Sequence, residues 1–209
     1  HQAPATLNVP LGFDVGLPGL GLIVDGNVQA KLGFDFKLSF GLNKTDGFFF
    51  VTDTRDASNN PIPELNMSVD ATTPGLSATG TLAILQVKAT DSTTNPSHLS
   101  ANFSIDLTDP NNDGKLTMAE MAAGPDLSQI VKANLTAQAN VNLHLVASFG
   151  SAANFPSIST DFALAWAFNN TSTTAPAASF GGKPTVNFTN VQLNAGEFFS
   201  NFARPILEA

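Results

Sequence analysis

The chain of 209 residues contains no cysteine. Disulfide bonds, thiolate metal ligands and cysteine nucleophiles are therefore excluded, although a domain of this size needs no disulfide to be stable. Tyrosine is absent as well, whereas there are 17 phenylalanines and one tryptophan. The aromatic content is thus almost purely apolar, with little capacity for hydrogen bonding.

Charge is also scarce. Charged residues make up 12% of the chain, about half the share in an average globular protein. The net charge of −8 and the pI of about 4.5 make nucleic acid and anionic membrane surfaces poor partners, and cations better ones. No run of 18 apolar residues occurs, so we expect no transmembrane segment. Abundant Asn, Ser and Thr with few Lys favour a secreted or cell-surface location.

Apolar and polar residues alternate with a period of two over long stretches. The even positions from Val28 to Leu42 are all apolar, and so are the odd positions from Val131 to Phe149. A strand places alternate residues on one face, whereas a helix would scatter them around its circumference. At about 3.3 Å per residue, these two strands would each extend roughly 50–60 Å. Shorter runs follow the same rule at Leu65–Ala71, Ala101–Leu107 and Phe162–Phe168.

These patterns predict an all-β fold, in which residues 1–209 form a single module. Turn sequences such as Lys44–Gly47 and Thr73–Gly75 indicate long antiparallel strands that form either a sandwich or a curled sheet. The apolar phase slips by one residue near Ile84–Leu85, which predicts a β-bulge. The stretch Asn169–Ala178 is the best candidate for a linker or long loop.

The alternation further predicts that Phe36 and Leu143 are buried, while Lys37 and Asn142 face water. Helical periodicity occurs in only two places. A short helix is expected to begin within Thr117–Ala123, and a C-terminal amphipathic helix is expected over Ala195–Leu207, ending at Pro205.

One segment fits the twelve-residue calcium-binding template at every constrained position. Short oxygen-bearing side chains stand at positions one, three and five, glycine stands at six, an apolar residue at eight and a glutamate at twelve. Position seven offers its backbone carbonyl, and position nine binds directly or through a water molecule. The predicted Ca2+ ligands are Asp109, Asn111, Asp113, Lys115, Thr117 and Glu120. Magnesium fits less well, because the long Glu120 side chain suits a larger ion.

Residues 109–120 resemble the loop of the EF-hand superfamily. The flanks differ from that family, because the alternating segment Ala101–Leu107 precedes the loop and no second loop is present. A single strand-loop-helix of this kind is similar to those of secreted modules such as dockerins. That resemblance implies a structural calcium ion rather than a signalling switch.

The wider pattern resembles repeat modules of giant bacterial secreted or surface proteins, which combine long alternating strands, an acidic balance, no cysteine and embedded calcium loops. The segments that carry this resemblance are Gly12–Leu22, Val28–Leu42, the calcium loop and Gly196–Leu207. It implies that the partners are neighbouring copies of the same module, in tandem or by strand exchange.

No catalytic constellation is apparent. The chain has no G-x-S-x-G elbow, P-loop or dinucleotide fingerprint. The carboxylates available for acid–base chemistry stand at turn or water-facing positions, where a solvated carboxylate is expected; they are Asp25, Asp35, Asp46, Asp53, Asp56, Asp70, Asp161 and Glu64. We therefore expect no enzyme activity.

The sequence thus favours a calcium-stabilised extracellular structural or adhesive module of a cell-surface scaffold or fibre. The alternative is a carrier, in which the apolar side of a curled sheet holds a lipid or another hydrophobic ligand.

Overall fold

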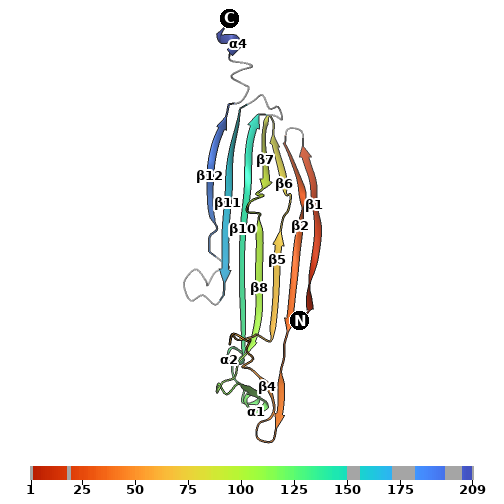
Figure 1. The fold of residues 1–209 in the computed structure, drawn as a ribbon, viewed down its shortest axis with the longest axis vertical. Coiled ribbons are helices and arrows are strands. Elements are labelled where there is room, and N and C mark those ends of the chain that lie inside the picture. Colours follow the sequence, from red (N-terminus) through yellow and green to blue (C-terminus); the bar gives the residue numbers. More distant parts are fainter. Residues whose placement is uncertain (1, 18–19, 150–155, 171–181, 196–203, 209) are drawn as a thin grey trace.

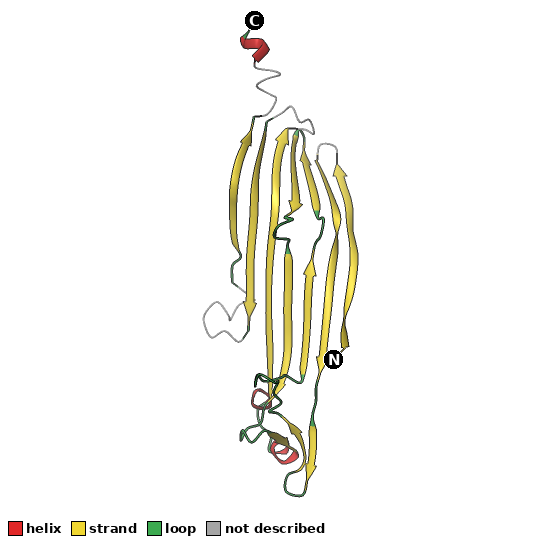
Figure 2. Ribbon diagram, viewed as in Figure 1, coloured by secondary structure: helices red, strands yellow, loops and turns green. Residues whose placement is uncertain are grey.

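The computed structural model describes residues 2–17, 20–149, 156–170, 182–195 and 204–208. Most of these residues lie in β-strands, which confirms the all-β prediction (Figure 2). The strands of a large sheet are β1 (Gln2–Leu17), β2 (Leu20–Phe36), β5 (Leu65–Thr72), β6 (Ser77–Leu82), β7 (Leu85–Asp91), β8 (His98–Leu107), β10 (Val131–Phe149), β11 (Ser157–Asn169) and β12 (Thr185–Asn194). A small sheet contains β3 (Phe40–Asn43), β4 (Gly47–Val51) and β9 (Lys115–Thr117).

The nine strands of the large sheet occupy seven positions side by side. Strands β5 and β6 both pair with β2, one beyond the other, and β8 and β7 both pair with β10 in the same way. Across the sheet the order is therefore β1, β2, β5 with β6, β8 with β7, β10, β11 and β12 (Figure 1). All of these pairings are antiparallel, as the sequence predicts.

The register of these strands puts most of the apolar residues of every strand on the same side of the sheet. One row across the sheet consists of Ala5, Leu32, Val69, Ala101, Ala137 and Phe168. The next row, which is offset by one residue along each strand, consists of Thr6, Lys31, Asp70, Ser100, Gln138 and Ala167. We call the side that carries the first row the apolar face and the opposite side the polar face.

The large sheet is a single layer. In the view along the shortest axis, its strands lie side by side and no second layer of described chain covers them (Figure 1). Of the two predicted arrangements, a sandwich does not form within the described chain. The predicted burial of Phe36 is wrong for the same reason: no second layer of described chain covers it, and its side chain is 59% exposed. Leu143 and Asn142 are half-buried, and Lys37 is exposed.

Two local predictions about strands are also corrected. The run Val28–Leu42 is not one strand, because the chain leaves the large sheet after Phe36 and re-forms a strand as β3. The phase slip near Ile84 is a hairpin turn rather than a bulge. Leu82 pairs with Leu85 across a two-residue turn, in which Ala83 has a φ of 53°. A two-residue turn explains the slip, because it brings residues three apart in sequence opposite each other on one face.

The small sheet and two short helices form a small lobe at one end of the large sheet (Figure 1). We use this name for residues 37–64 and 108–130. The helices are α1 (Met118–Ala122) and α2 (Leu127–Ile130), of which α1 confirms the helix predicted within Thr117–Ala123. Strand β9 pairs with β4 and thereby joins the segment after β8 to the β3–β4 hairpin.

The C-terminal helix predicted over Ala195–Leu207 is only partly covered, because residues 196–203 lie outside the described residues. Helix α4 (Arg204–Leu207) contains Pro205, so the prediction that the helix ends there is wrong. Of the candidate linker, residues 171–178 also lie outside the described residues. None of the described helices is long and apolar enough to cross a membrane.

Candidate metal centre

The predicted calcium loop connects the end of β8 to α1, within the small lobe. Its first residues lie just beyond Leu107, the last residue of β8, and its last residue lies in the first turn of α1. The loop therefore belongs to the connection between β8 and β10, two long strands that are neighbours in the large sheet.

The side chains at positions one, three and five turn into the loop and accept hydrogen bonds from its backbone. The Asp109 carboxylate accepts from the N–H groups of Asp113 (3.0 Å) and Gly114 (3.1 Å). The Asn111 carbonyl oxygen accepts from Asp113 N–H at 2.9 Å, and Asp113 Oδ1 accepts from Lys115 N–H at 2.9 Å. These bonds hold three oxygen-bearing side chains on the inner side of one tight turn.

The glycine at position six is required by the turn. Gly114 has a φ of 82°, which is a left-handed conformation that side chains rarely tolerate. The residue two positions earlier, Asn112, also has a positive φ of 59°, which Asn tolerates better than most residues. The sequence N-D-G thus supplies suitable residues where the chain reverses.

The backbone carbonyl of Lys115 faces the loop. Thr52 N–H donates to the Gly114 carbonyl at 3.0 Å, and Val51 pairs with Lys115. In antiparallel strands, bonded and non-bonded pairs alternate, so the N–H and carbonyl of Lys115 point away from β4. The N–H donates to Asp113 within the loop, and the carbonyl lies on the same side, where a seventh-position ligand is needed.

Position eight anchors the loop. Leu116 is 2% exposed and is the one buried apolar side chain in the described part of the chain. It lies on β9 opposite Phe50 of β4. The sequence predicts this anchoring residue, but it does not predict that the β3–β4 hairpin provides the partner strand.

Thr117 and Glu120 form a capping box at the start of α1. Glu120 N–H donates to Thr117 Oγ1 at 3.2 Å, and Thr117 N–H and Oγ1–H both donate to Glu120 Oε2 at 2.8 Å. The other carboxylate oxygen, Glu120 Oε1, is buried and has no hydrogen-bond partner. A buried carboxylate oxygen without a partner is costly, and a cation bound to it would offset that cost.

The loop residues therefore fit a calcium ion in their chemistry, which comprises carboxylates, an amide oxygen, a backbone carbonyl and one unpartnered buried oxygen. Their carboxylates are not gathered, however. Among the described residues, no three His, Cys, Asp or Glu side chains lie close enough together to hold a metal ion. The capping box directs one oxygen of Glu120 toward Thr117 rather than toward Asp109 and Asp113.

The Lys115 side chain links the loop to the β3–β4 hairpin. Its Nζ lies 2.7 Å from Asp46 Oδ2 and 5.3 Å from the centre of the Phe49 ring. The hydrogen bond to Asp46, together with the nearby Asp113 charge, raises the pKa of Lys115. A hydrogen bond from Asn43, followed by the one from Lys115, lowers the pKa of Asp46. The ammonium group of Lys115 is thus charged and bonded to the hairpin, while the backbone carbonyl of the same residue faces the loop.

Two features of this site were not predicted, a hydrogen bond to Asp109 and a polar cavity. Thr52 Oγ1 donates to Asp109 Oδ2 at 2.7 Å, so a residue 57 positions away in sequence orients the first loop carboxylate. A polar cavity of about 290 Å³ lies beside it, and its lining includes Thr52, Arg55, Asp109 and Asp113. No sequence signal marks Thr52, because the contact depends on the pairing of β4 with β9.

Glu64 corrects a further prediction. It was expected to be solvated, but it is 4% exposed, and its Oε2 accepts from Leu107 N–H at 2.6 Å. The Glu64 carbonyl accepts from Lys37 N–H at 2.7 Å. Burial raises the pKa of Glu64, to which the nearby Asp106 charge adds, and burial also raises the pKa of Asp106. Glu64 thus fastens the end of β8 to the junction between the large sheet and the small lobe, two residues before the loop begins.

The other sequence-predicted carboxylates mostly occupy polar positions. Asp70 lies 2.7 Å from His98 Nε2, and Asp161 lies 2.8 Å from His144 Nδ1, both on the polar face. A hydrogen bond from Asn190, followed by the one from His144, lowers the pKa of Asp161. These pairs join neighbouring strands.

Comparison with known proteins gives no relative: no family model, no curated protein and no solved structure matches this chain.

Proposed function

We propose that this chain is a calcium-stabilised structural module of a secreted or cell-surface scaffold or fibre, with no catalytic step. The observation that carries the calcium proposal is the buried, unpartnered Glu120 Oε1. It stands at the twelfth position of a loop whose other side-chain oxygens already point inward. Ca2+ prefers such oxygen ligands and takes six to eight of them.

The proposed ion has a mechanical role. The loop joins β8 to β10 and also pairs with β4, so an ion bound by Asp109, Asn111, Asp113, the Lys115 carbonyl and Glu120 would brace the small lobe against the large sheet. Thr117 would bind through a water molecule, because its hydroxyl is already bonded to Glu120. A ligand that binds only the folded state stabilises it by mass action.

Calorimetric titration of metal-free protein with Ca2+ tests this proposal. Glu120→Gln removes one charge and weakens a carboxylate ligand, so we expect it to reduce affinity by at least about tenfold. Asp126→Asn is the matched control, since it removes one charge from the same lobe outside the loop. The calcium proposal is wrong if the unaltered chain binds no Ca2+, or if both variants lose affinity equally.

The structural role also includes contact between copies at the sheet edges. Strand β12 is an edge strand of ten residues, none of them charged and all of them exposed. The opposite edge, β1, contains Pro10, which cannot donate a hydrogen bond. Unpaired strand edges template pairing with another chain. We therefore place strand addition at β12, and Val191→Pro is expected to abolish it.

A second candidate function is supported by the uncovered apolar face. A carrier of a lipid or another hydrophobic ligand would hold its cargo there. Native mass spectrometry of protein purified without detergent tests this candidate: a bound mass that organic extraction removes would support it. A single mass equal to that of the chain would count against it.

A further inference from the structure

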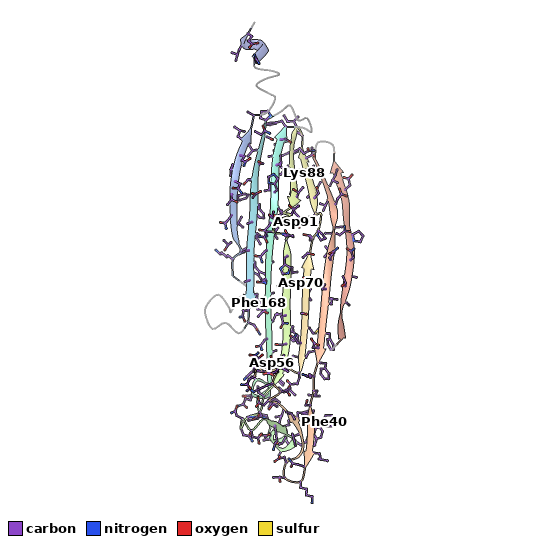
Figure 3. All side chains as sticks on the ribbon, in the orientation of Figure 1. Phe40, Asp56, Asp70, Lys88, Asp91 and Phe168 are labelled. Carbon is purple, nitrogen blue, oxygen red and sulfur yellow. The ribbon has the colours of Figure 1, made fainter. Side chains whose placement is uncertain are left out.

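The apolar face carries large side chains that remain exposed along the whole sheet. Leu32 and Met67 are both 44% exposed and Leu99 is 43% exposed, although all three lie on interior strands. Figure 3 shows the side chains of the strands with no further described main chain over them. Monomeric proteins rarely leave apolar patches larger than a few hundred Å² open to water.

The total accessible surface of the chain is also larger than a compact monomer would have. A compact folded monomer of 21.8 kDa would expose about 9,300 Å². This chain exposes 13905 Å², roughly half as much again as the size relation gives. A main sheet that is one layer thick contributes to this excess.

Charge is segregated away from this face. Among the charged residues in the described strands of the large sheet, all except Asp91 lie in the register of the polar face. Asp91 lies where β7 ends, and its Oδ1 accepts from Ser97 N–H at 2.9 Å. The polar face carries ion pairs such as His98 with Asp70 and His144 with Asp161. An interface on the apolar face would therefore bury almost no charge.

The size of the apolar face matches an obligate interface between proteins. Strand β10 has 19 residues, which span about 60 Å, and seven strand positions span about 30 Å. Allowing for the shorter strands, one face offers about 1,500 Å², and two faces packed together would bury about 3,000 Å². That is within the range of obligate homodimers, whose interfaces are also the most apolar.

We infer that a second copy of this chain covers the apolar face, so that two single-layer sheets pack face to face as a sandwich. A second copy offers a face of equal area and equal chemistry, and a twofold axis makes such a contact self-complementary. Two sheets that pack in this way are a standard arrangement for apolar sheet faces. The contact is distinct from the strand addition proposed at the β12 edge.

Other occupants fit the apolar face less well. A small ligand of ordinary size fills a cavity of about 300–1,000 Å³, which leaves most of a face of this area uncovered. An anionic membrane surface is opposed by the net charge of −8. A bound hydrophobic ligand remains as an outcome of the test.

The absence of cysteine allows a direct test by thiol labelling. Ala139→Cys places one thiol on the apolar face in the middle of β10, and Gln138→Cys places one on the polar face next to it. With a water-soluble maleimide, the labelling rate at Cys in place of Ala139 should fall by about tenfold or more as protein concentration rises through the dimer dissociation constant. The rate at position 138 should not change.

Three results would overturn this inference. Equal labelling of both variants at every concentration would mean that the face is open. Protection of position 139 at all concentrations, with an added mass, would identify a bound hydrophobic ligand instead. A dimer in sedimentation with position 139 still reactive would place the contact at the sheet edge.

A second pair of variants tests the same surface without labelling. Leu99→Glu and Gln138→Glu each add one negative charge near the centre of the sheet, the first on the apolar face and the second on the polar face. We expect only Leu99→Glu to shift sedimentation from dimer to monomer, with circular dichroism confirming that both variants remain folded. If both variants remain dimeric, the face-to-face contact is wrong.

The inference rests on the proposed structural role, and its failure can be told apart from failure of the calcium proposal. Sedimentation is measured on metal-free and Ca2+-loaded protein, alongside the titration of the loop. Dimerisation without calcium binding would refute only the calcium brace. Calcium binding by a strict monomer would refute only the face-to-face contact.

Discussion

The large sheet and the small lobe differ in how far their apolar side chains are buried. In the lobe, Leu116 is 2% exposed on the shortest strand of the molecule. In the large sheet, the strands are up to 19 residues long, yet no apolar side chain in its described part is fully buried. The lobe encloses its own anchoring residue, whereas the sheet displays a complete apolar face.

The difference follows from how the two regions are built. In the lobe, the second half of the predicted calcium loop forms β9 and begins α1, and β4 of the β3–β4 hairpin pairs with β9. Within β4, Phe48 contacts Phe50 edge-on with ring centres 5.2 Å apart. In the large sheet, the strands pair within one layer, and no segment of the described chain crosses over the face. Burial in the lobe therefore comes from segments of the chain itself, whereas the apolar face of the sheet lies open in the described part of the chain.

The largest expected effect lies in the lobe. Leu116→Ala truncates a buried side chain that is 2% exposed, so it should lower the free energy of unfolding by about 2–5 kcal/mol. Met118→Ala, two residues later and 56% exposed, should cost less than about 1 kcal/mol. Chemical denaturation followed by circular dichroism measures both, and equal losses would contradict the anchoring role of Leu116.

Removing calcium should have the next largest effect. If Ca2+ binds only the folded state, chelation from 100 times the dissociation constant should cost about 2.7 kcal/mol. Millimolar Ca2+ should restore the melting temperature, and Glu120→Gln should make it insensitive to chelator. A melting curve that is the same in excess chelator and in excess Ca2+ would contradict the brace.

The strands were predictable because their signal is local. Alternation from Val131 to Phe149 reproduces β10 residue by residue, since one sheet face repeats every two residues. The run Val28–Leu42 misled because alternation says nothing about which sheet a strand joins, and Phe40 belongs to the lobe. Alternation likewise predicts a face but not its cover, which is why the burial of Phe36 was predicted wrongly.

The same contrast between local and long-range signals applies to the candidate site. The loop template identifies Asp109 to Glu120 because all twelve residues are consecutive. Thr52 and Glu64 were not recognised, since each reaches the loop region through strand pairing over more than 40 residues. Long-range pairing leaves no short motif in the sequence, so it must be read from the fold.

The stability cost of shortening a side chain on the apolar face should depend on whether a second copy covers that face. In a single copy, Leu32 is 44% exposed, so Leu32→Ala should cost about 1 kcal/mol in dilute protein. If a second copy buries the face, the cost should rise toward about 2–5 kcal/mol at high concentration. Gln29→Ala, on the polar face of the same strand, should show no concentration dependence. A constant cost for Leu32→Ala across concentrations would favour an open face.

The smallest effect concerns pH at the junction between the two regions. Burial raises the pKa of Glu64 above its usual value of 4.5. Between the pKa of Glu64 in the unfolded chain and its raised pKa in the folded protein, folded Glu64 keeps a proton that the unfolded chain has released. The free energy of unfolding therefore falls as pH rises through this window. The carboxyls with lowered pKa, Asp46, Asp56 and Asp161, act in the opposite direction and below 3.8, so they do not mask it. Glu64→Gln can still accept the hydrogen bond from Leu107 N–H but cannot titrate, so it should reduce this decline in stability with pH.

Asp106 also has a raised pKa and titrates in the same window, so the double variant Glu64→Gln/Asp106→Asn should flatten the pH profile further. Melting curves from pH 4 upward measure the effect; an unchanged slope in Glu64→Gln would mean that its carboxyl is hydrated in the folded protein.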